Sequence, residues 1–275
     1  MEVRKARPDD WPDIAGLNQR ARRVLPQLWW WEEHLADDLF IVVERKGIVA
    51  GVLFAWPDES PVAWVRLAAL DDALDAGEWL DLALPPVLEG LRRRGTRRLA
   101  WMDYGGWVGP YLEARGFKPL TEVVTLVKFD RALPDKNAVG VRLRPASDAD
   151  IPAVVAVDRA AFTPHWWHSE TTMRRRAAVA SHFAVAEMAG EVAGYAEGEL
   201  RLPKAHLNRI AVHPAYQGRG IGTLLLRDAL RAFWRSGAEQ VTLNTQADNR
   251  YSQRLYRRFG FEPTGDAVTV WELQL

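Results

Sequence analysis

The stretch HPAYQGRGIGTLLL, His213–Leu226, holds three glycines at alternate positions and continues directly into a leucine-rich segment. It follows a strand-like run, NRIAV, and its leucines open a series of apolar residues at the three- and four-residue spacings of an amphipathic helix. The start of a helix has unpaired N–H groups and the positive end of the helix dipole, which together favour anions such as phosphate. Glycine lets the backbone approach a phosphate closely. The stretch therefore predicts a phosphate-binding loop.

Three phosphate-binding patterns can be compared with this loop. The nucleotide P-loop requires GxxxxGK followed by serine or threonine, and here no lysine precedes Thr223. The dinucleotide pattern GxGxxG, started at Gly220, would place its third glycine at Leu225. The remaining pattern, Q-x-x-G-x-G, is matched by Gln217, Gly220 and Gly222. The comparison argues against ATP and NAD as ligands of this loop.

The matched pattern resembles the acetyl-CoA pyrophosphate loop of the GNAT acyltransferase superfamily. Two further features carry the resemblance. The loop follows RIAVHPAYQ, whose His-Pro break is typical of the family, and DNRYSQRLYRRFGF follows about thirty residues later. The second segment resembles the closing asparagine–tyrosine–glycine–phenylalanine signature of the family. The resemblance covers residues 141–275 and implies a mixed, mainly antiparallel sheet flanked by helices.

The chain also repeats itself. Four pairs of segments align with an offset that drifts only slightly: VRKARPDDWP (3–12) with LRPASDADIP (143–152), VVERKGIVAG (42–51) with AVAEMAGEVAG (184–194), RLAAL (66–70) with RIAVH (209–213), and YLEARGFKP (111–119) with LYRRFGFEP (255–263). The repeat predicts an α/β (α+β) protein of two tandem GNAT-fold domains, residues 1–135 and 141–275. The linker is expected in RALPDKNAVG, 131–140, where Pro, Asp, Asn and Gly lie between two strand-like runs.

The resemblance implies a role for each matched position in the second half. Ile210, Ala211 and Val212 would pair with the pantetheine arm of acetyl-CoA through their backbone groups. Asn249 would hold that arm by its amide, although an asparagine at this place also suits a helix cap. Tyr256 would lie beside the sulfur. The pyrophosphate would be bound by the loop itself: Gln217, Gly218, Arg219, Gly220, Ile221, Gly222 and Thr223.

The chemistry of acetyl transfer favours the same residues. When a neutral amine attacks a thioester, negative charge develops on the carbonyl oxygen, so a fixed N–H donor such as that of Val212 is expected to face it. The departing thiolate needs a proton. A thiol has a pKa near ~8.5 and a tyrosine near ~10, so Tyr256 could supply that proton at a cost of only ~2 kcal/mol. The chain has no cysteine for an acyl-enzyme, which favours direct transfer.

The general base and the acceptor are less well defined. Some relatives place a glutamate where this chain has Asn244, so Glu197 and Glu199, on a strand expected to border the site, are the candidate bases, directly or through water. Both could equally belong to an exposed strand edge, and His206 is a weaker third candidate. The aromatic loop FTPHWWHS, 162–169, falls where acceptors enter in similar proteins. The acceptor amine itself stays open, from small amines and antibiotics to peptide N-termini and protein lysines.

The first half lacks the glycine loop. At the aligned positions Leu74, Asp75, Ala76 and Trp79 replace Gln217, Gly218, Arg219 and Gly222. Acidic residues surround the one glycine that persists, Gly77, and would repel a pyrophosphate. Leu112 stands where the second half has Tyr256. We therefore expect one acetyl-CoA per chain, in a plan similar to the mycothiol synthase-like tandem GNAT proteins.

Composition narrows the classes of function. Lys plus Arg and Asp plus Glu each number 36, a balance that argues against a dedicated nucleic-acid binder. There is no cysteine and no HExxH pair, so no metal is expected. The sequence shows neither an apolar run of about 18 residues nor the apolar core of a signal peptide, so we expect a cytoplasmic protein away from membranes, monomeric or homodimeric. A catalytically silent acyl-CoA sensor or scaffold is the alternative, and a protein-interaction module using the tryptophan-rich first half is a third.

Overall fold

The computed structural model describes residues 1–26, 31–134 and 139–275, and divides into two compact units. The first contains Met1–Thr121 and Val268–Leu275, and the second contains Glu122–Ala267. The division falls earlier than the linker expected at 131–140, of which 135–138 lie outside the described residues.

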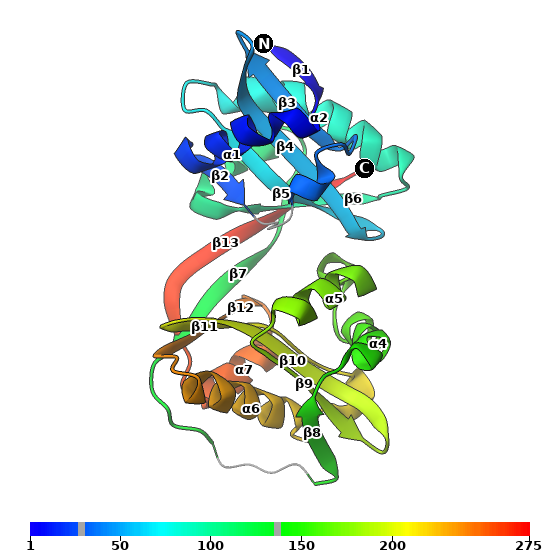
Figure 1. Cartoon of the computed structure of the whole chain (residues 1–275), viewed down its shortest axis with the longest axis vertical. Coiled ribbons are helices and arrows are strands. Elements are labelled where there is room, and N and C mark those ends of the chain that lie inside the picture. The colour runs from blue at the N-terminus through cyan, green and yellow to red at the C-terminus, as the bar shows by residue number, and fades with distance from the viewer. Residues whose placement is uncertain (27–30, 135–138) are drawn as a thin grey trace. The chain divides into compact units, whose positions relative to one another are not determined.

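Two long strands explain where the division falls. β7 (Lys118–Lys128) pairs from Val123 onward with a strand of the second unit, and β13 (Glu262–Gln274) pairs from Thr269 onward with a strand of the first. The sheet of each unit is therefore completed by the last strand of the other half of the repeat. Local hydrophobic patterns do not reveal this exchange. Both strands can be followed in Figure 1.

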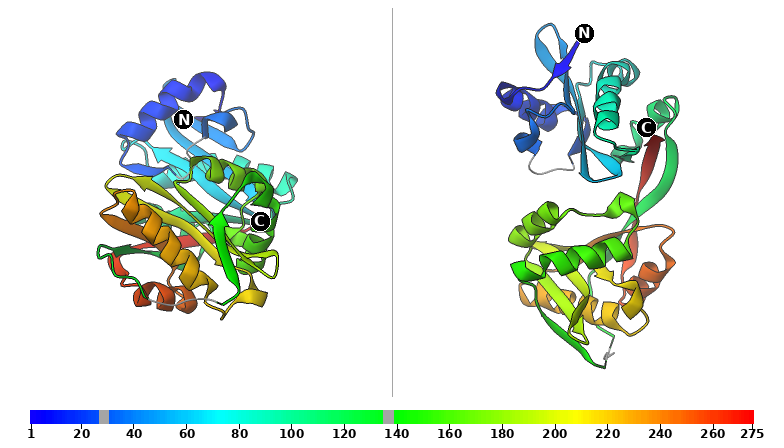
Figure 2. Two further views of the ribbon diagram at one scale, coloured as in Figure 1. Left: turned by 60° about the horizontal axis from the view of Figure 1, so that its bottom comes forward. Right: turned by 90° about the vertical axis from the view of Figure 1, so that its right-hand side faces the viewer.

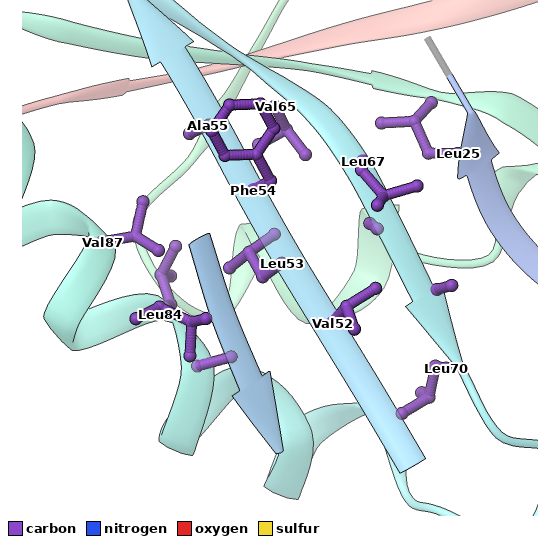
Figure 3. Packing of buried hydrophobic residues seen from close by; sticks show 14 of the residues in the cluster. Leu25, Val52, Leu53, Phe54, Ala55, Val65, Leu67, Leu70, Leu84 and Val87 are labelled. Atoms are coloured by element: carbon purple, nitrogen blue, oxygen red, sulfur yellow. The ribbon is translucent and has the colours of Figure 1, made fainter. Parts of the chain in front are cut away.

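The first unit is a mixed sheet with helices packed on it. Its elements are β1 (Glu2–Lys5), α1 (Trp11–Arg20), β2 (Arg23–Pro26), β3 (Phe40–Arg45), β4 (Ile48–Glu59), β5 (Val62–Leu70), α2 (Ala76–Arg93), β6 (Arg98–Asp103) and α3 (Gly109–Glu113). The strand order is β1-β3-β4-β5-β6-β13, with β2 also paired to β5. Figure 3 shows part of its core, in which Leu84 and Val87 of α2 and Leu53 of β4 belong to one cluster of buried side chains.

The second unit repeats this plan. It contains β8 (Val141–Pro145), α4 (Ile151–Ala161), α5 (Glu170–Val179), β9 (His182–Met188), β10 (Glu191–Arg201), β11 (Lys204–Val212), α6 (Ile221–Arg235), β12 (Gln240–Gln246) and α7 (Arg250–Arg258), with strand order β7-β12-β11-β10-β9-β8. One core packs α6 and α7 on one face of the sheet, and a separate core packs α4 and α5 on the other. The views of Figure 2 show α4 and α5 in green and α6 and α7 in orange. The α/β (α+β) class is confirmed.

A partly buried side-chain network recurs at the same place in both units. Arg144 donates to Asp150 and to Glu187, each at 2.7 Å. Arg4 likewise donates to Asp10 at 2.7 Å and to Glu44 at 2.8 Å. The network fixes the first strand of each unit to the helical turn that follows, so the repeat extends from sequence to specific contacts.

Within the described residues, no helix is both long enough and apolar enough to span a membrane.

Candidate active site

The central feature of the second unit is the place where two parallel strands part. β11 and β12 pair from Lys204–Gln240 to Leu207–Leu243, after which β11 continues to Val212 without β12 beside it. A cavity of about 580 Å³ opens there. Its wall contains all the predicted cofactor residues except Arg219: Ile210, Ala211, Val212, Gln217, Gly218, Gly220, Ile221, Gly222, Thr223, Asn249 and Tyr256.

The free edge of β11 faces this cavity with its main-chain groups. His213 N–H donates to Ala193 O of β10 at 2.9 Å, and Val212 lies opposite Gly194. Because residues of an antiparallel strand turn their N–H and C=O alternately to the two sides, Val212 and Ile210 turn theirs away from β10. The Val212 carbonyl accepts from Gln217 Nε2 at 3.1 Å. Because they turn away from β10, the N–H groups of Ile210 and Val212 point toward the side of β11 that β12 no longer covers.

The glycine loop joins this edge to α6. Gly218 and Gly220 have φ of 78° and 85°, in the left-handed region that favours glycine. Gly220 is also the N-cap of α6, and it makes no side-chain cap to the helix. The first-turn amides of Ile221, Gly222 and Thr223 therefore begin the helix beside the cavity without the usual capping oxygen.

Gly222 differs from the two loop glycines. It lies inside the helix, and a Cβ added there would meet Leu255 Cδ2 at 3.6 Å and Val212 Cγ2 at 3.7 Å, which is ordinary contact. The backbone therefore does not require glycine at this position. What the missing side chain provides is open space in the cavity wall.

α7 supplies two further predicted residues. Asn249 is its N-cap, with Oδ1 accepting from Ser252 N–H at 3.2 Å, and it lines the cavity as well. Tyr256 is 5% exposed, and burial raises the pKa of its phenol to about 12 while the hydrogen bond with Ser252 lowers it. Protonating a thiolate of pKa near ~8.5 from this phenol costs about 5 kcal/mol, more than an ordinary tyrosine would require.

The candidate bases lie outside the cavity wall. Glu197 is 1% exposed, and its Oε1 accepts from Arg176 Nε of α5 at 2.6 Å. Asn208 Nδ2 donates to both Glu197 and Glu199, at 3.2 Å in each case. His206 contacts Thr242 Oγ1 at 2.8 Å, and burial lowers the pKa of its imidazole to about 4, so the ring is neutral at pH 7.

Sequence reasoning missed a buried cluster beside the aromatic loop. Asp158 of α4 and Tyr195 of β10 are both fully buried, and the Tyr195 hydroxyl donates to Asp158 Oδ2. Arg209 Nε donates to the same oxygen at 2.6 Å, and its Nη2 donates to the Trp166 carbonyl. The sequence signal for this cluster is Asp158 itself, a single acidic residue at the end of the apolar run IPAVVAVD. A carboxylate buried there requires a charged partner, so the run indicates a buried ion pair.

The cluster fixes the aromatic loop against the cavity. Asp158 Oδ1 accepts from His168 N–H at 3.2 Å, and Trp167 Nε1 donates to the Phe162 carbonyl at 2.9 Å. The Arg209 guanidinium lies 4.0 Å from the centroid of the Phe162 ring, which is itself part of the cavity wall. Arg209 therefore holds one wall of the cavity in a defined position.

Replacing Asp158 by alanine is expected to destabilise the protein by about 3–5 kcal/mol, because the buried Arg209 charge would lose its partner. Urea unfolding followed by circular dichroism measures the change. Glu170→Ala is the matched control, since its pair with Arg174 is about half exposed on both sides and should contribute under about 0.5 kcal/mol. Equal effects of the two substitutions would contradict the assignment of a buried charge pair.

The corresponding strand edge of the first unit, that of β5, can be aligned with the edge of β11 through a β-bulge. Phe54 lies opposite Leu67 and Ala55 opposite Val65, so Arg66 is left unmatched. In the second unit Asn208 is skipped in the same way, between Arg209 and Leu207. Leu70 therefore corresponds to Val212 and Ala68 to Ile210. The expected alignment of RLAAL with RIAVH was wrong by one residue, because sequence similarity does not reveal where a bulge resets the register.

In the first unit a strand of the chain itself lies along this edge. Asp71 N–H donates to Ala50 O at 2.8 Å, so Leu70 and Ala68 turn their main-chain groups away from β4. β2 pairs with them there, placing Arg23 opposite Leu70 and Leu25 opposite Ala68. The edge that is open in the second unit is thus filled in the first.

The start of α2 is closed as well. α2 begins at Ala76, so its N-cap Asp75 corresponds to Gly220 of α6, and the Asp75 carboxylate accepts from Glu78 N–H at 2.9 Å. Gly77 takes the place of Gly222. Trp79, which replaces Gly222 in the sequence alignment, is instead fully buried in the core, where its ring would clash with any Cβ on Gly51.

A mixed sheet whose parallel central strands part beside a helix that begins at a glycine is the arrangement expected from the resemblance to an acyltransferase, and comparison with known proteins specifies the family. The family model described as Acetyltransferase (GNAT) family matches residues 152–261. An N-alpha-acetyltransferase from Sulfurisphaera tokodaii is 31% identical over 143 residues, 46% of this chain and 83% of that protein. The chain belongs to the GNAT acetyltransferase family, whose members use acyl-CoA, and it is an acetyltransferase of that family.

Other similar proteins cover different shares of the chain. N-alpha-acetyltransferase RimI of Mycobacterium tuberculosis is 38% identical over 104 residues, 36% of this chain and 63% of that protein. The tandem GNAT protein from the clavulanic acid biosynthesis pathway matches 99% of this chain and 98% of its own, with a TM-score of 0.69 and 18% identity. A GCN5-related N-acetyltransferase from Sphaerobacter thermophilus matches 99% and 95%, with a TM-score of 0.66 and 19% identity. The tandem GNAT architecture thus extends over the whole chain.

Proposed function

We propose that the second unit transfers an acetyl group from acetyl-CoA directly to a primary amine. The observation that carries this proposal is the cavity itself, which joins an open strand edge, an uncapped helix start and a buried tyrosine in one wall. The pantetheine arm pairs with Ile210 and Val212, and the pyrophosphate meets the first-turn amides of α6. Arg219, next to these amides in sequence but outside the cavity wall, adds positive charge to the loop.

The reaction needs two groups of this chain at the thioester. The amine nitrogen attacks the carbonyl carbon, and the N–H of Val212 donates to the oxygen as it becomes negative. The C–S bond then breaks and the thiolate takes the phenolic proton of Tyr256. The extra proton of the new amide nitrogen passes to solvent, and the Tyr256 phenolate regains a proton from solvent before the next turnover. Transfer through water to Glu197 or Glu199 is the alternative, less well supported because neither carboxylate lines the cavity.

The acceptor class is proposed from the relatives. Two of the similar proteins named above are N-alpha-acetyltransferases, so a peptide with a free α-amino group is the first acceptor to test. The experiment measures CoA release by the purified chain with a panel of amines that includes such peptides, free amino acids, aminoglycosides and lysine side chains. Turnover with at least one amine supports the proposal, whereas release at the rate of hydrolysis with every amine contradicts it.

A silent acyl-CoA sensor is the second candidate, because the cavity would bind the cofactor equally well without catalysis. The two functions differ in their need for Tyr256. A sensor would bind acetyl-CoA and leave every amine of the panel unmodified.

We further propose that only the second unit binds acetyl-CoA. This rests on β2, which takes up the main-chain groups of Ala68 and Leu70, and on Asp75, whose carboxylate occupies the helix start where a phosphate would lie. The first unit then contributes a degenerate GNAT-like domain that supports the fold without holding a cofactor.

Hydrogen exchange on the full chain is expected to separate the two edges. The amides of Ile210 and Val212 should exchange rapidly in the free protein and at least tenfold more slowly with acetyl-CoA, because the pantetheine arm would then accept from Ile210 and the thioester oxygen from Val212. The amides of Ala68 and Leu70 should be protected in both states, since β2 already pairs with them. Cofactor-dependent protection of Ala68 and Leu70 would contradict the proposal.

The raised pKa of Tyr256 predicts the alkaline side of the pH–rate profile. A phenol of pKa about 12 keeps its proton throughout the range up to pH 10. The value of kcat should therefore rise as the acceptor amine loses its proton and then stay level to pH 10, measured by CoA release at saturating substrates. A fall in kcat with an apparent pKa below 10 would contradict the role of Tyr256 as acid.

A further inference from the structure

An exposed aromatic ring lies in the wall of the cavity. Tyr251, in the first turn of α7, is 83% exposed, unlike the buried Tyr256 one and a half turns later. The guanidinium of Arg254 lies 5.0 Å from the centroid of the Tyr251 ring, and both residues line the cavity. Since Tyr251 packs into no core, its ring offers a free face to a ligand.

The charge around this ring has one sign. The residues that line the cavity include two arginines, Arg254 and Arg258, and no aspartate or glutamate. Arg258 Nη2 donates to Thr223 Oγ1 at 2.6 Å, which ties α7 to the first turn of α6. The tyrosine–arginine pair therefore lies on the helix that adjoins the amides proposed to hold the pyrophosphate. This part of the cavity suits a flat ring bearing a further anionic group.

We propose that Tyr251 and Arg254 form a subsite for the adenosine 3′-phosphate end of coenzyme A. Nucleobases stack on exposed aromatic rings, and arginine pairs strongly with a phosphate monoester. The proposal rests on the proposed binding of acetyl-CoA and adds a selection between donors. The chain would take its acyl group from free acyl-CoA in preference to a phosphopantetheine arm that lacks the nucleotide.

Titration calorimetry of the full chain with three ligands tests the subsite. CoA carries base and 3′-phosphate, 3′-dephospho-CoA carries the base alone, and 4′-phosphopantetheine carries neither. The wild type should bind CoA at least tenfold more tightly than dephospho-CoA. Arg254→Ala should weaken the binding of CoA about tenfold and leave the affinity for dephospho-CoA unchanged within twofold. Tyr251→Ala should weaken both nucleotide ligands by a similar factor, about fivefold or more, without affecting phosphopantetheine.

Arg257→Ala is the matched control. Arg257 is exposed on the same helix but does not line the cavity, so this variant should bind all three ligands like the wild type. Equal affinity of the wild type for CoA and dephospho-CoA would overturn the subsite, as would an Arg254→Ala variant that weakens both to the same degree. No binding of CoA at all would instead overturn the proposed function from which the subsite is built.

Discussion

Replacing Tyr256 by phenylalanine is expected to lower kcat about 100-fold and to leave the dissociation constant of CoA unchanged within twofold. General acids contribute roughly 10²–10⁴-fold to such reactions, and phenylalanine removes the proton while keeping the ring that packs near Phe261. The large effect is expected even though the pKa of Tyr256 is raised, because without the phenol the thiolate would leave unprotonated within a buried site. Steady-state kinetics and calorimetry on the same preparation measure the two quantities.

Tyr104→Phe is the control for this substitution. It removes the hydroxyl of an exposed tyrosine of the first unit that does not line the cavity, so kcat should remain within twofold of the wild type. Unchanged kcat in Tyr256→Phe would remove the acid role and favour the view that the thiolate departs without help from this residue.

Replacing Gly222 by aspartate is expected to weaken the binding of CoA at least 100-fold without unfolding the protein. The backbone at Gly222 accepts a Cβ, and an acidic residue in the first turn of a helix is favourable. The new carboxylate would nevertheless lie in the cavity wall, where it would repel the pyrophosphate and compete for the same amides. The first unit already has such an arrangement, with Asp75 capping α2.

Gly222→Ala separates the charge from the added volume. Its Cβ would make only ordinary contacts with Leu255 and Val212, so the affinity for CoA should fall by less than tenfold. Calorimetry gives the affinities and thermal unfolding verifies the fold. If the aspartate and alanine variants bound CoA equally well, the pyrophosphate would not lie at the start of α6.

The sequence predicted most of the residues that line the cavity in which we propose that the cofactor binds. Glycine at Gly218 and Gly220 signals left-handed backbone before a helix, and that requirement is local, so the loop and the start of α6 could be read from residue types alone. Gly222 differs from these two, because its backbone does not need glycine, and its role in the pattern stays a prediction. Asn249 fulfils its capping role and also reaches the cavity.

Features that depend on non-local pairing could not be predicted. Nothing in RVLP indicates that Arg23–Pro26 lies on β5, because strand register is set by partners distant in sequence. The sequence likewise does not indicate the bulge that makes Leu70 the structural equivalent of Val212. It does not indicate that β13 belongs to the first unit either. The Asp158–Arg209 pair joins residues 51 positions apart, which no periodicity reveals.

We propose that one chain with two like units binds one acetyl-CoA, along the open edge of β11. Calorimetric titration of the full chain with acetyl-CoA, repeated with Gly222→Asp, tests this most directly. A stoichiometry of one that is lost in the variant is the predicted result. Two molecules bound per chain, or one that binds the variant with undiminished affinity, would contradict it.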